Sequence, residues 1–463
     1  ATSYVLPNGE HVDNCQHVTL GCCTNLEDFY RRVGSAGKLQ FFDRLFFLDP
    51  QRRTGVMQAG FLPAPLHMTG SFLSFAPLSA MDKLSIGRAL AAILFSGGRP
   101  KDAYSDQPVS MLAWLERHRQ THRAIERFWR VVLVSALDEE LDRTDARFGI
   151  DVFWKAFLKN GRGYRMGVPS VPLAELYLGC RAAIEARSGE VNLRSPVRSL
   201  CVKAGTLEAV QFDGGREESA DAFVLAIPQD RLHELLPDEV RAANPLLAGL
   251  ERYKVSPITG VHFWFDREVT EEPFLTLLDT QTQWIFNKTA LYGRRVVDPP
   301  LAARAEDAAS VAGRSYAGPG PAGEPGAPVP AVSSGQYLQL VVSASYDLLR
   351  KSREEIIELC LREVHQALPA AREAQLLKAT VIKEASATFS PEPGVDRWRP
   401  AQQTATPRLV LAGDWTATGW PATMEGAVRS GYLAAEAVLR SVGSAQSFLV
   451  PDLPASGLSR LFD

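Results

Sequence analysis

An apolar strand, a Gly-Asp turn and a long helix follow one another near the C-terminus, and this order constrains the fold more than any other feature. The strand covers residues 408–412 and ends at Gly413 and Asp414. The helix is predicted to have Pro421 at its first position and to run to about Arg440. Small residues recur at four-residue spacing along it: Ala422, Gly426, Ser430 and Ala434, with Thr423, Ala427, Gly431 and Ala435 beside them. Each helical glycine costs about 1 kcal/mol relative to alanine, so we expect close backbone packing against a sheet or a cofactor.

The turn and the helix start have the chemistry of a flavin site. A carboxylate at a strand end accepts hydrogen bonds from sugar hydroxyls, so Asp414 would contact the ribityl or pyrophosphate region. The positive end of a helix favours negative charge, so the amides of Thr423 and Met424 would face the pyrimidine edge of the ring. An ordinary α/β crossover with a tightly packed helix explains the same spacing equally well.

The rest of the chain alternates between predicted strands and helices, which indicates a mixed α/β protein. The apolar run 222–227, closed by Pro228, is typical of a strand covered on both faces. Residues 302–335 lack apolar periodicity and are predicted to be a flexible insertion joining two strands of one sheet. The other predicted elements are strands at 3–6, 197–202, 207–212, 284–286 and 337–342, and helices at 26–33, 79–95, 171–187 and 354–368.

Charge and cysteine content exclude several classes of protein. The 50 basic and 53 acidic residues give a net charge of −3, which argues against binding to nucleic acid. The six cysteines have no zinc-type spacing, and scattered thiols indicate a reducing, cytoplasmic compartment. His118, His122 and Glu126 are spaced like metal ligands, but the arginines around them favour a cationic surface, so no metal is expected.

Phenylalanine is concentrated in one short segment. Seven of the 22 phenylalanines lie within 35 residues: Phe41, Phe42, Phe46, Phe47, Phe61, Phe72 and Phe75. Core packing explains such a cluster, as does a channel for a long hydrocarbon or a contact with a membrane interface.

The segment 409–439 closely resembles the C-terminal flavin-binding segment of the FAD-dependent amine oxidase and phytoene desaturase superfamily. Within it, the chain most resembles the squalene-associated hydroxysqualene dehydroxylases. The matching segments are 12–18, 128–130, 172–177 and 448–454. The resemblance implies an α/β fold in which a Rossmann-like FAD-binding domain is interleaved with an α+β substrate-binding domain. The FAD domain would comprise residues 1–20, 165–235 and 405–445. The substrate domain would comprise residues 21–164 and 236–404, and residues 446–463 would form a C-terminal tail.

The resemblance also implies roles for individual residues. Gly413 and Asp414 would contact the sugar and phosphate region of FAD, and Thr423, Met424 and Gly426 would contact its flavin end. Val197 would contact the adenine side. Gln16 and His17 would approach the flavin from the substrate side. His17 would act as the proton donor in catalysis, although a structural histidine bonded to the backbone is an equal alternative.

The chain departs from the family pattern in two ways. The strand and GxGxxG turn that bind the pyrophosphate in the family should precede residue 1, so we expect an N-terminally truncated chain. A literal match at 318–323 lies in the insertion, and its prolines remove amide donors. Cys15 stands where the subgroup usually has glycine, and its side chain would narrow the approach to the flavin.

The function implied by the resemblance is reductive dehydroxylation of hydroxysqualene to squalene in hopanoid biosynthesis by an FAD-dependent oxidoreductase. Its partners would be a long apolar isoprenoid substrate, the inner face of the membrane by peripheral contact, and other enzymes of the squalene pathway. A phytoene-type carotenoid desaturase, or an amine oxidase-like flavoenzyme, is the alternative within the same fold. A non-catalytic lipid-binding scaffold is the alternative from another class.

Overall fold

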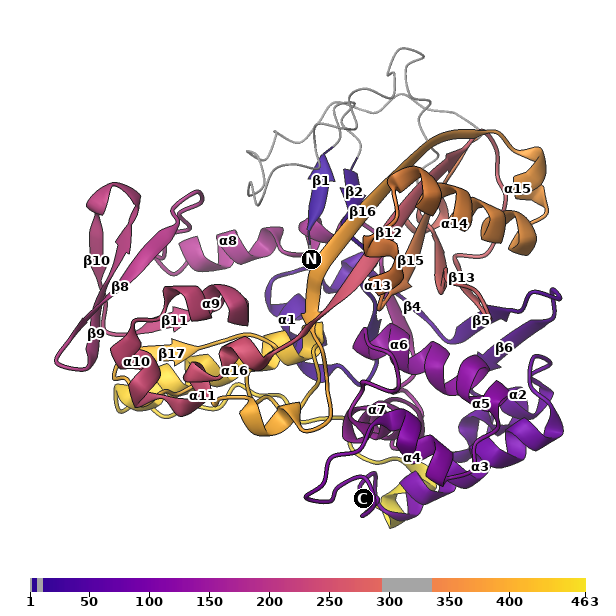
Figure 1. Ribbon diagram of the computed structural model, residues 1–463, viewed down its shortest axis with the longest axis horizontal. Helices are drawn as coiled ribbons and strands as arrows, with labels where there is room; N and C mark the ends of the chain where they lie inside the picture. The colour runs from indigo at the N-terminus through magenta and orange to yellow at the C-terminus, as the bar shows by residue number, and fades with distance from the viewer. Residues whose placement is uncertain (1, 6–10, 294–334) are drawn as a thin grey trace.

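The computed structural model describes residues 2–5, 11–293 and 335–463. The GxGxxG match at 318–323 and all but the last residue of the predicted insertion lie outside these residues. The described chain is a mixed α/β structure, as predicted (Figure 1). Its helices are α1 Thr24–Arg32, α2 Thr69–Ser74, α3 Ala80–Phe95, α4 Met111–Arg117, α5 His122–Ala124, α6 Val131–Leu137, α7 Ala146–Val152, α8 Leu178–Glu185, α9 Gln229–Leu235, α10 Asp238–Ala243, α11 Pro245–Ala248, α12 Lys288–Leu291, α13 Tyr346–Leu349, α14 Arg353–Ala367, α15 Ala370–Glu373 and α16 Met424–Ser441.

A seven-stranded sheet in the order β16-β12-β15-β14-β13-β5-β6 is the largest in the described chain. Its pairs are antiparallel except β13 with β5, which run parallel. Residue Trp284 pairs with Val341, so the two strands predicted on either side of the insertion are neighbours, as expected. The strands are β5 Arg44–Leu48, β6 Thr54–Gln58, β12 Val255–Phe265, β13 Phe274–Leu277, β14 Trp284–Asn287, β15 Gln336–Ser343 and β16 Leu376–Phe389.

Four smaller sheets contain the remaining named strands. Strand β11 Phe223–Leu225 runs parallel to β17 Leu409–Leu411, next to helix α16. The strands β8 Val197–Lys203 and β9 Thr206–Phe212 form the predicted hairpin, which β10 Glu217–Ser219 extends. The other sheets pair β1 Ser3–Val5 with β2 His11–Asp13, and β3 Thr19–Leu20 and β4 Leu39–Phe42 with β7 Met166–Pro169.

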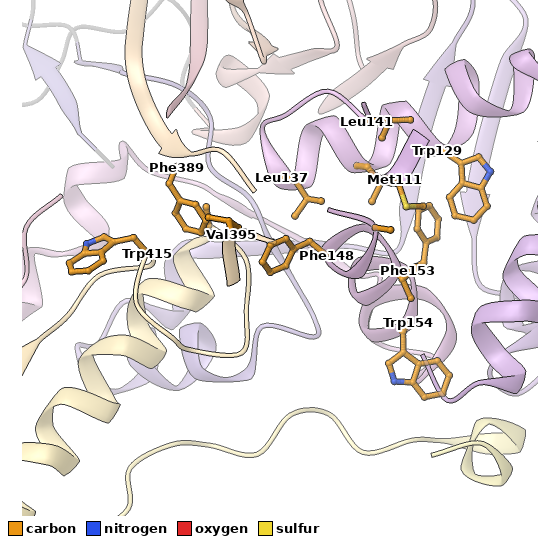
Figure 2. Packing of buried hydrophobic residues seen from close by; sticks show 14 of the residues in the cluster. Met111, Trp129, Leu137, Leu141, Phe148, Phe153, Trp154, Phe389, Val395 and Trp415 are labelled. Atoms are coloured by element: carbon orange, nitrogen blue, oxygen red, sulfur yellow. The ribbon is translucent and has the colours of Figure 1, made fainter. Parts of the chain in front are cut away.

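One hydrophobic core links the helical region to the C-terminal turn. Figure 2 shows Trp129 and Phe153 of the helical region, and it also shows Phe389 and Trp415 beside the C-terminal helix. All four side chains belong to a single cluster of buried residues. The C-terminal turn is therefore held by the same packing that holds the helical region.

Three predictions about local structure need correction. Helix α16 begins at Met424 with Thr423 as its N-cap, so Pro421 lies before the helix and not at its first position. The predicted helix at 171–187 is shorter, because a single 3₁₀ segment at Leu173–Leu176 precedes α8. Strand β11 is only three residues long, and Val224 is 45% exposed, so the described residues do not cover both of its faces.

Candidate functional site

The turn between β17 and α16 requires glycine at its first position. Gly413 has φ +143°, and a Cβ there would lie 2.3 Å from Nε1 of Trp415. The amide of Gly413 donates to Oγ of Ser430 at 2.8 Å. Ser430 lies on the buried small-residue face of α16 together with Gly426 and Ala434, as predicted. Strand and helix are therefore joined closely enough to fix the turn between them.

Asp414 is half-buried, and Arg399 holds the backbone around it. The Arg399 side chain is fully buried, and its Nη2 donates to the backbone oxygen of Asp414 at 2.7 Å and to Oγ1 of Thr418 at 3.1 Å. Burial raises the pKa of the Asp414 carboxyl, and the charge of Arg399 acts in the opposite direction. The carboxyl is thus placed at the strand end, where it can accept hydrogen bonds from ligand hydroxyl groups.

The start of α16 is a capped helix N-terminus. Oγ1 of Thr423 accepts a hydrogen bond from the amide of Gly426 at 3.1 Å. A Cβ on Gly426 would lie 2.7 Å from the backbone oxygen of Pro421, so this position also requires glycine. The cap satisfies the Gly426 amide and leaves the first-turn amides of Met424 and Glu425 able to donate to an anionic group. Gly413, Asp414, Thr423, Met424 and Gly426 therefore all lie between the end of β17 and the first turn of α16.

Glu425 connects this turn to α1, and sequence reasoning missed it. Its buried carboxylate accepts hydrogen bonds from the Asn25 amide at 3.2 Å, the Asn25 side-chain amide at 2.9 Å and the Leu26 amide at 2.8 Å. Nη1 of Arg429 lies 3.6 Å away. Burial raises the pKa of Glu425, and these donors and Arg429 partly offset the rise. The carboxylate thereby caps the first turn of α1 from a different helix.

A buried ion pair holds the segment that contains the other predicted site residues. Nζ of Lys288 donates to Oδ2 of Asp13 at 2.9 Å and to Oε1 of Gln16 at 2.7 Å. The side chains of Lys288 and Asp13 are 0% and 1% exposed. Tyr292 also donates to Asp13 Oδ2, at 2.8 Å. Gln16 is thus oriented by a residue far away in the sequence, at the start of α12.

His17 is half-buried and contacts its own segment. Its Nδ1 lies 3.4 Å from the backbone oxygen of Cys15 and 3.7 Å from the Cys15 sulfur. Burial lowers the pKa of His17 to about 4, and burial raises the pKa of the Cys15 thiol to about 12. At neutral pH the imidazole is therefore uncharged and Cys15 is a thiol. The contact with the Cys15 oxygen is the backbone contact expected for a structural histidine, and the proton-donor role of His17 stays a prediction.

Hydrogen bonds hold the segment 13–26 at both ends, and one of these bonds attaches the segment to α16. Lys288 fixes one end at Asp13, and Glu425 of α16 fixes the other at α1. Gln16 and His17 lie between these anchors. Val197 opens β8 and pairs with Phe212 in a different sheet, and its role at the adenine side stays a prediction.

The residues of this turn fit a flavin. The turn offers a half-buried carboxyl, an N-terminal helix turn with donor amides and two positions restricted to glycine. These groups suit the ribityl hydroxyls and the polar edge of the ring, which carries negative charge when reduced. Among the described residues, no three His, Cys, Asp or Glu side chains meet in an arrangement that could hold a metal ion.

The phenylalanine cluster is mostly packed inside the protein. The rings of Phe47 and Phe75 are buried with centroids 5.3 Å apart, and those of Phe42 and Phe46 pack against Phe274. Phe61 differs, because it is 97% exposed. Core packing therefore explains most of the cluster, and Phe61 needs another explanation.

A cavity of about 770 Å³ lies away from the C-terminal turn, between α5–α6 and the end of β13. Its lining is charged, which does not suit an apolar chain. The charged lining residues are Glu126, Arg130, Glu140, Asp279 and Glu363.

In the part of the chain that the structure describes, no helix is both long and apolar enough to span a bilayer.

Comparison with known proteins identifies relatives along almost the whole chain. The profile of the family "Flavin containing amine oxidoreductase" matches residues 2–439. A 15-cis-phytoene desaturase of Synechococcus elongatus is 24% identical over 453 residues, covering 93% of this chain and 86% of that protein. A zeta-carotene desaturase of Synechocystis is 24% identical over 460 residues, covering 96% of this chain and 91% of that protein.

Solved structures with the same fold include two amine oxidases. A putrescine oxidase variant superimposes with a TM-score of 0.64 at 14% identity, covering 95% of this chain and 90% of the other. The cyclohexylamine oxidase of Brevibacterium oxydans gives a TM-score of 0.57 at 13% identity, covering 96% and 91%. These identities establish the likeness of fold alone.

Proposed function

Because this chain belongs to the flavin containing amine oxidoreductase family and uses FAD, we propose that it desaturates a long isoprenoid hydrocarbon. The observation that carries the proposal is the similarity to the phytoene and zeta-carotene desaturases over more than nine tenths of the chain. The family match also favours an enzyme over a lipid-binding scaffold. Membership of the squalene-associated subgroup, expected from short motifs, has no such support.

In this proposal the chain's residues position the cofactor and the substrate. Desaturation removes a hydride and a proton from adjacent carbons, and bound oxidised FAD supplies the hydride acceptor. Asp414 would hold the ribityl chain, and the amides of Met424 and Glu425 would stabilise negative charge at the pyrimidine edge. Gln16, oriented by Lys288, would form part of the wall on the substrate side.

His17 is the candidate proton-transfer residue of this proposal because it lies in the segment next to Gln16. Burial lowers the pKa of His17 to about 4, so the imidazole is uncharged at neutral pH. Such an imidazole is a weak proton acceptor as well as a poor proton donor, so its pKa does not distinguish desaturation from dehydroxylation. The role of His17 in catalysis is therefore tested by substitution.

Product analysis separates the candidate reactions. FAD-loaded protein is incubated with phytoene and a quinone oxidant, with hydroxysqualene after flavin reduction, and with putrescine in air. The proposal predicts a desaturated product from phytoene only. Squalene as the sole product would replace the proposal with dehydroxylation, and putrescine oxidation would replace it with amine oxidation. Substitution His17→Ala should lower the rate with phytoene, and an unchanged rate would remove His17 from the mechanism.

Because phytoene and its relatives dissolve in bilayers, the proposal includes a peripheral contact between the protein and a membrane. Contacts with other enzymes of the squalene pathway stay a prediction from the sequence resemblance.

A further inference from the structure

Large apolar side chains are exposed together in the loop before α2, on α2 and on α3. Their exposed fractions run from 44% to 97%. A folded chain gains by covering side chains of this size, so an exposed group of them marks an interaction surface. The six residues are Phe61, Leu66, Leu73, Met81, Leu84 and Phe95, and we call them the α2–α3 surface.

The outer face of α3 forms a continuous stripe within this surface. Met81, Leu84, Arg88 and Phe95 follow one another at spacings of three, four and seven residues, so they lie on one side of the helix. The opposite side of the helix, which includes Ile86, is buried in the main core. The exposed side of α3 therefore carries three large apolar side chains together with the basic Arg88.

The C-terminal tail extends the surface. The amide of Leu458 donates to the backbone oxygen of Ala64 at 2.7 Å, and the rings of Phe95 and Phe462 lie 5.3 Å apart. Leu461 of the tail is 77% exposed. Figure 1 shows the C-terminus beside α3, with α2 and β6 at the same edge of the molecule.

The exposed charges around the α2–α3 surface are basic. Between residues 44 and 101 the two acidic residues are Asp49 and Asp82, and both are buried. Asp49 is bonded to Arg53 and Arg127, and Asp82 to Ser79 and Thr121. The basic residues of the same stretch are Arg44, Arg52, Arg53, Lys83, Arg88, Arg99 and Lys101.

Acidic groups at the rim of this region have partners of their own. Asp43 forms an ion pair with Arg165 at 2.5 Å and Asp463 with Lys159 at 2.8 Å, and Oδ2 of Asp102 lies 2.8 Å from Nε2 of His118. The surface therefore presents apolar side chains surrounded by net positive charge.

We propose that the α2–α3 surface docks onto a lipid bilayer that contains anionic lipid. Apolar side chains inserted at the interface, with basic residues beside them, are the combination that binds peripheral proteins to such membranes. A second copy of the chain fits less well, because its identical surface would bring Lys83 and Arg88 of one copy against those of the other. The inference deepens the proposed function and rests on it for its purpose, because docking gives access to a hydrocarbon dissolved in the bilayer.

Vesicle binding of the full chain tests the proposal without turnover. Flotation is measured with vesicles of phosphatidylcholine alone and with an equal mixture of phosphatidylcholine and phosphatidylglycerol. The wild type should float with the mixed vesicles and much less with the neutral ones. The double variant F61S/L84S should bind the mixed vesicles more than about tenfold more weakly. The variant R88E should lose about fivefold or more.

Matched control variants lie on exposed positions elsewhere. L193S removes a leucine that is 53% exposed, and K203E reverses a charge on the β8–β9 hairpin, which is distant from α3 in Figure 1. Both should bind vesicles like the wild type, and all variants should keep the wild-type unfolding midpoint because their side chains are exposed.

Three results would overturn the docking proposal. In the first, the wild type does not float with mixed vesicles. In the second, the control variants lose as much binding as F61S/L84S. In the third, the wild type forms a concentration-dependent dimer without lipid, and F61S/L84S abolishes that dimer. If the protein does not bind vesicles but still converts detergent-dispersed phytoene, only the docking proposal is overturned. If the protein binds vesicles as expected but does not convert phytoene, only the proposed function is overturned.

Discussion

Replacing Lys288 by methionine should destabilise the protein strongly, because it leaves a buried carboxylate without its counter-ion. Lys288 and Asp13 are 0% and 1% exposed, and their charged atoms lie 2.9 Å apart. Removing one partner of such a pair typically costs about 3–5 kcal/mol of unfolding free energy. Asp13 would keep its hydrogen bonds from Ser3, Leu173 and Tyr292, which places the expected loss near the lower end, about 3 kcal/mol.

The dependence on pH follows from the pKa of Asp13. Burial raises that pKa, but Lys288 and the hydrogen bonds outweigh burial, so the pKa lies below its ordinary value of 3.8. A lowered carboxyl pKa contributes stability that is complete above the ordinary value and is lost as the pH falls through the folded value. In Lys288→Met this contribution is absent, so the loss of stability relative to the wild type should persist at neutral pH and shrink as the pH falls below 3.8, through the folded pKa of Asp13 in the wild type.

The assay is denaturant unfolding of the single variants K288M and D13N and of the double variant at neutral pH. The double variant should be less destabilised than the sum of the singles by about 2 kcal/mol, since neither charge is then left unpaired. The control K254M breaks an exposed pair with Glu392 and should cost no more than about 1 kcal/mol. If K288M lost no more stability than the control, or if the effects of K288M and D13N were additive, the buried ion pair would not be the source of the stability.

Three further predictions concern the C-terminal turn and His17. Gly413→Ala should cost about 1–3 kcal/mol and weaken FAD binding measured by flavin fluorescence, because its Cβ would meet Trp415 at positive φ; the control Gly431→Ala has open space and should be neutral or slightly stabilising. Equal effects at both positions would contradict this. Glu425→Ala leaves the amides of α1 without their acceptor and should lower the unfolding free energy by about 2–3 kcal/mol, with protease cleavage near α1 as a local readout; unchanged stability and cleavage would contradict it. The imidazole of His17, with its pKa at about 4 and not at 6.5, should show no NMR titration between about pH 5 and 8, and a midpoint inside that range would contradict burial as the cause.

Local patterns in the sequence were sufficient for much of the fold. Helices α1, α3 and α14 and the hairpin β8–β9 lie where periodicity placed them, because each has a continuous apolar face and clear end signals. The start of α16 was misplaced by three residues, because Pro421 has the signature of a first helical position while Thr423 makes the actual cap. Pro421 and Thr423 are both acceptable signals for a helix start, and only the tertiary contacts of the turn show which of them is used.

The site was predictable where it depends on neighbours in the chain and not where it depends on distant ones. Gly413 and Gly426 could be singled out because glycine next to a strand end or within a helix has a local cost. Lys288 could not, since it meets Asp13 across 275 residues and nothing near it in the sequence marks a buried cation. Glu425 has a weak signal, a carboxylate in a run of small residues, but its partner α1 is visible only in the structure.

The direction of electron flow between the flavin and the hydrocarbon distinguishes desaturation from dehydroxylation. The FAD-loaded protein is mixed anaerobically with phytoene, and its flavin absorbance is followed; a parallel sample with reduced flavin receives hydroxysqualene. We expect phytoene to bleach the oxidised flavin as it is desaturated, and hydroxysqualene to leave the reduced flavin unchanged. Reoxidation of the flavin by hydroxysqualene, with no response to phytoene, would contradict this expectation.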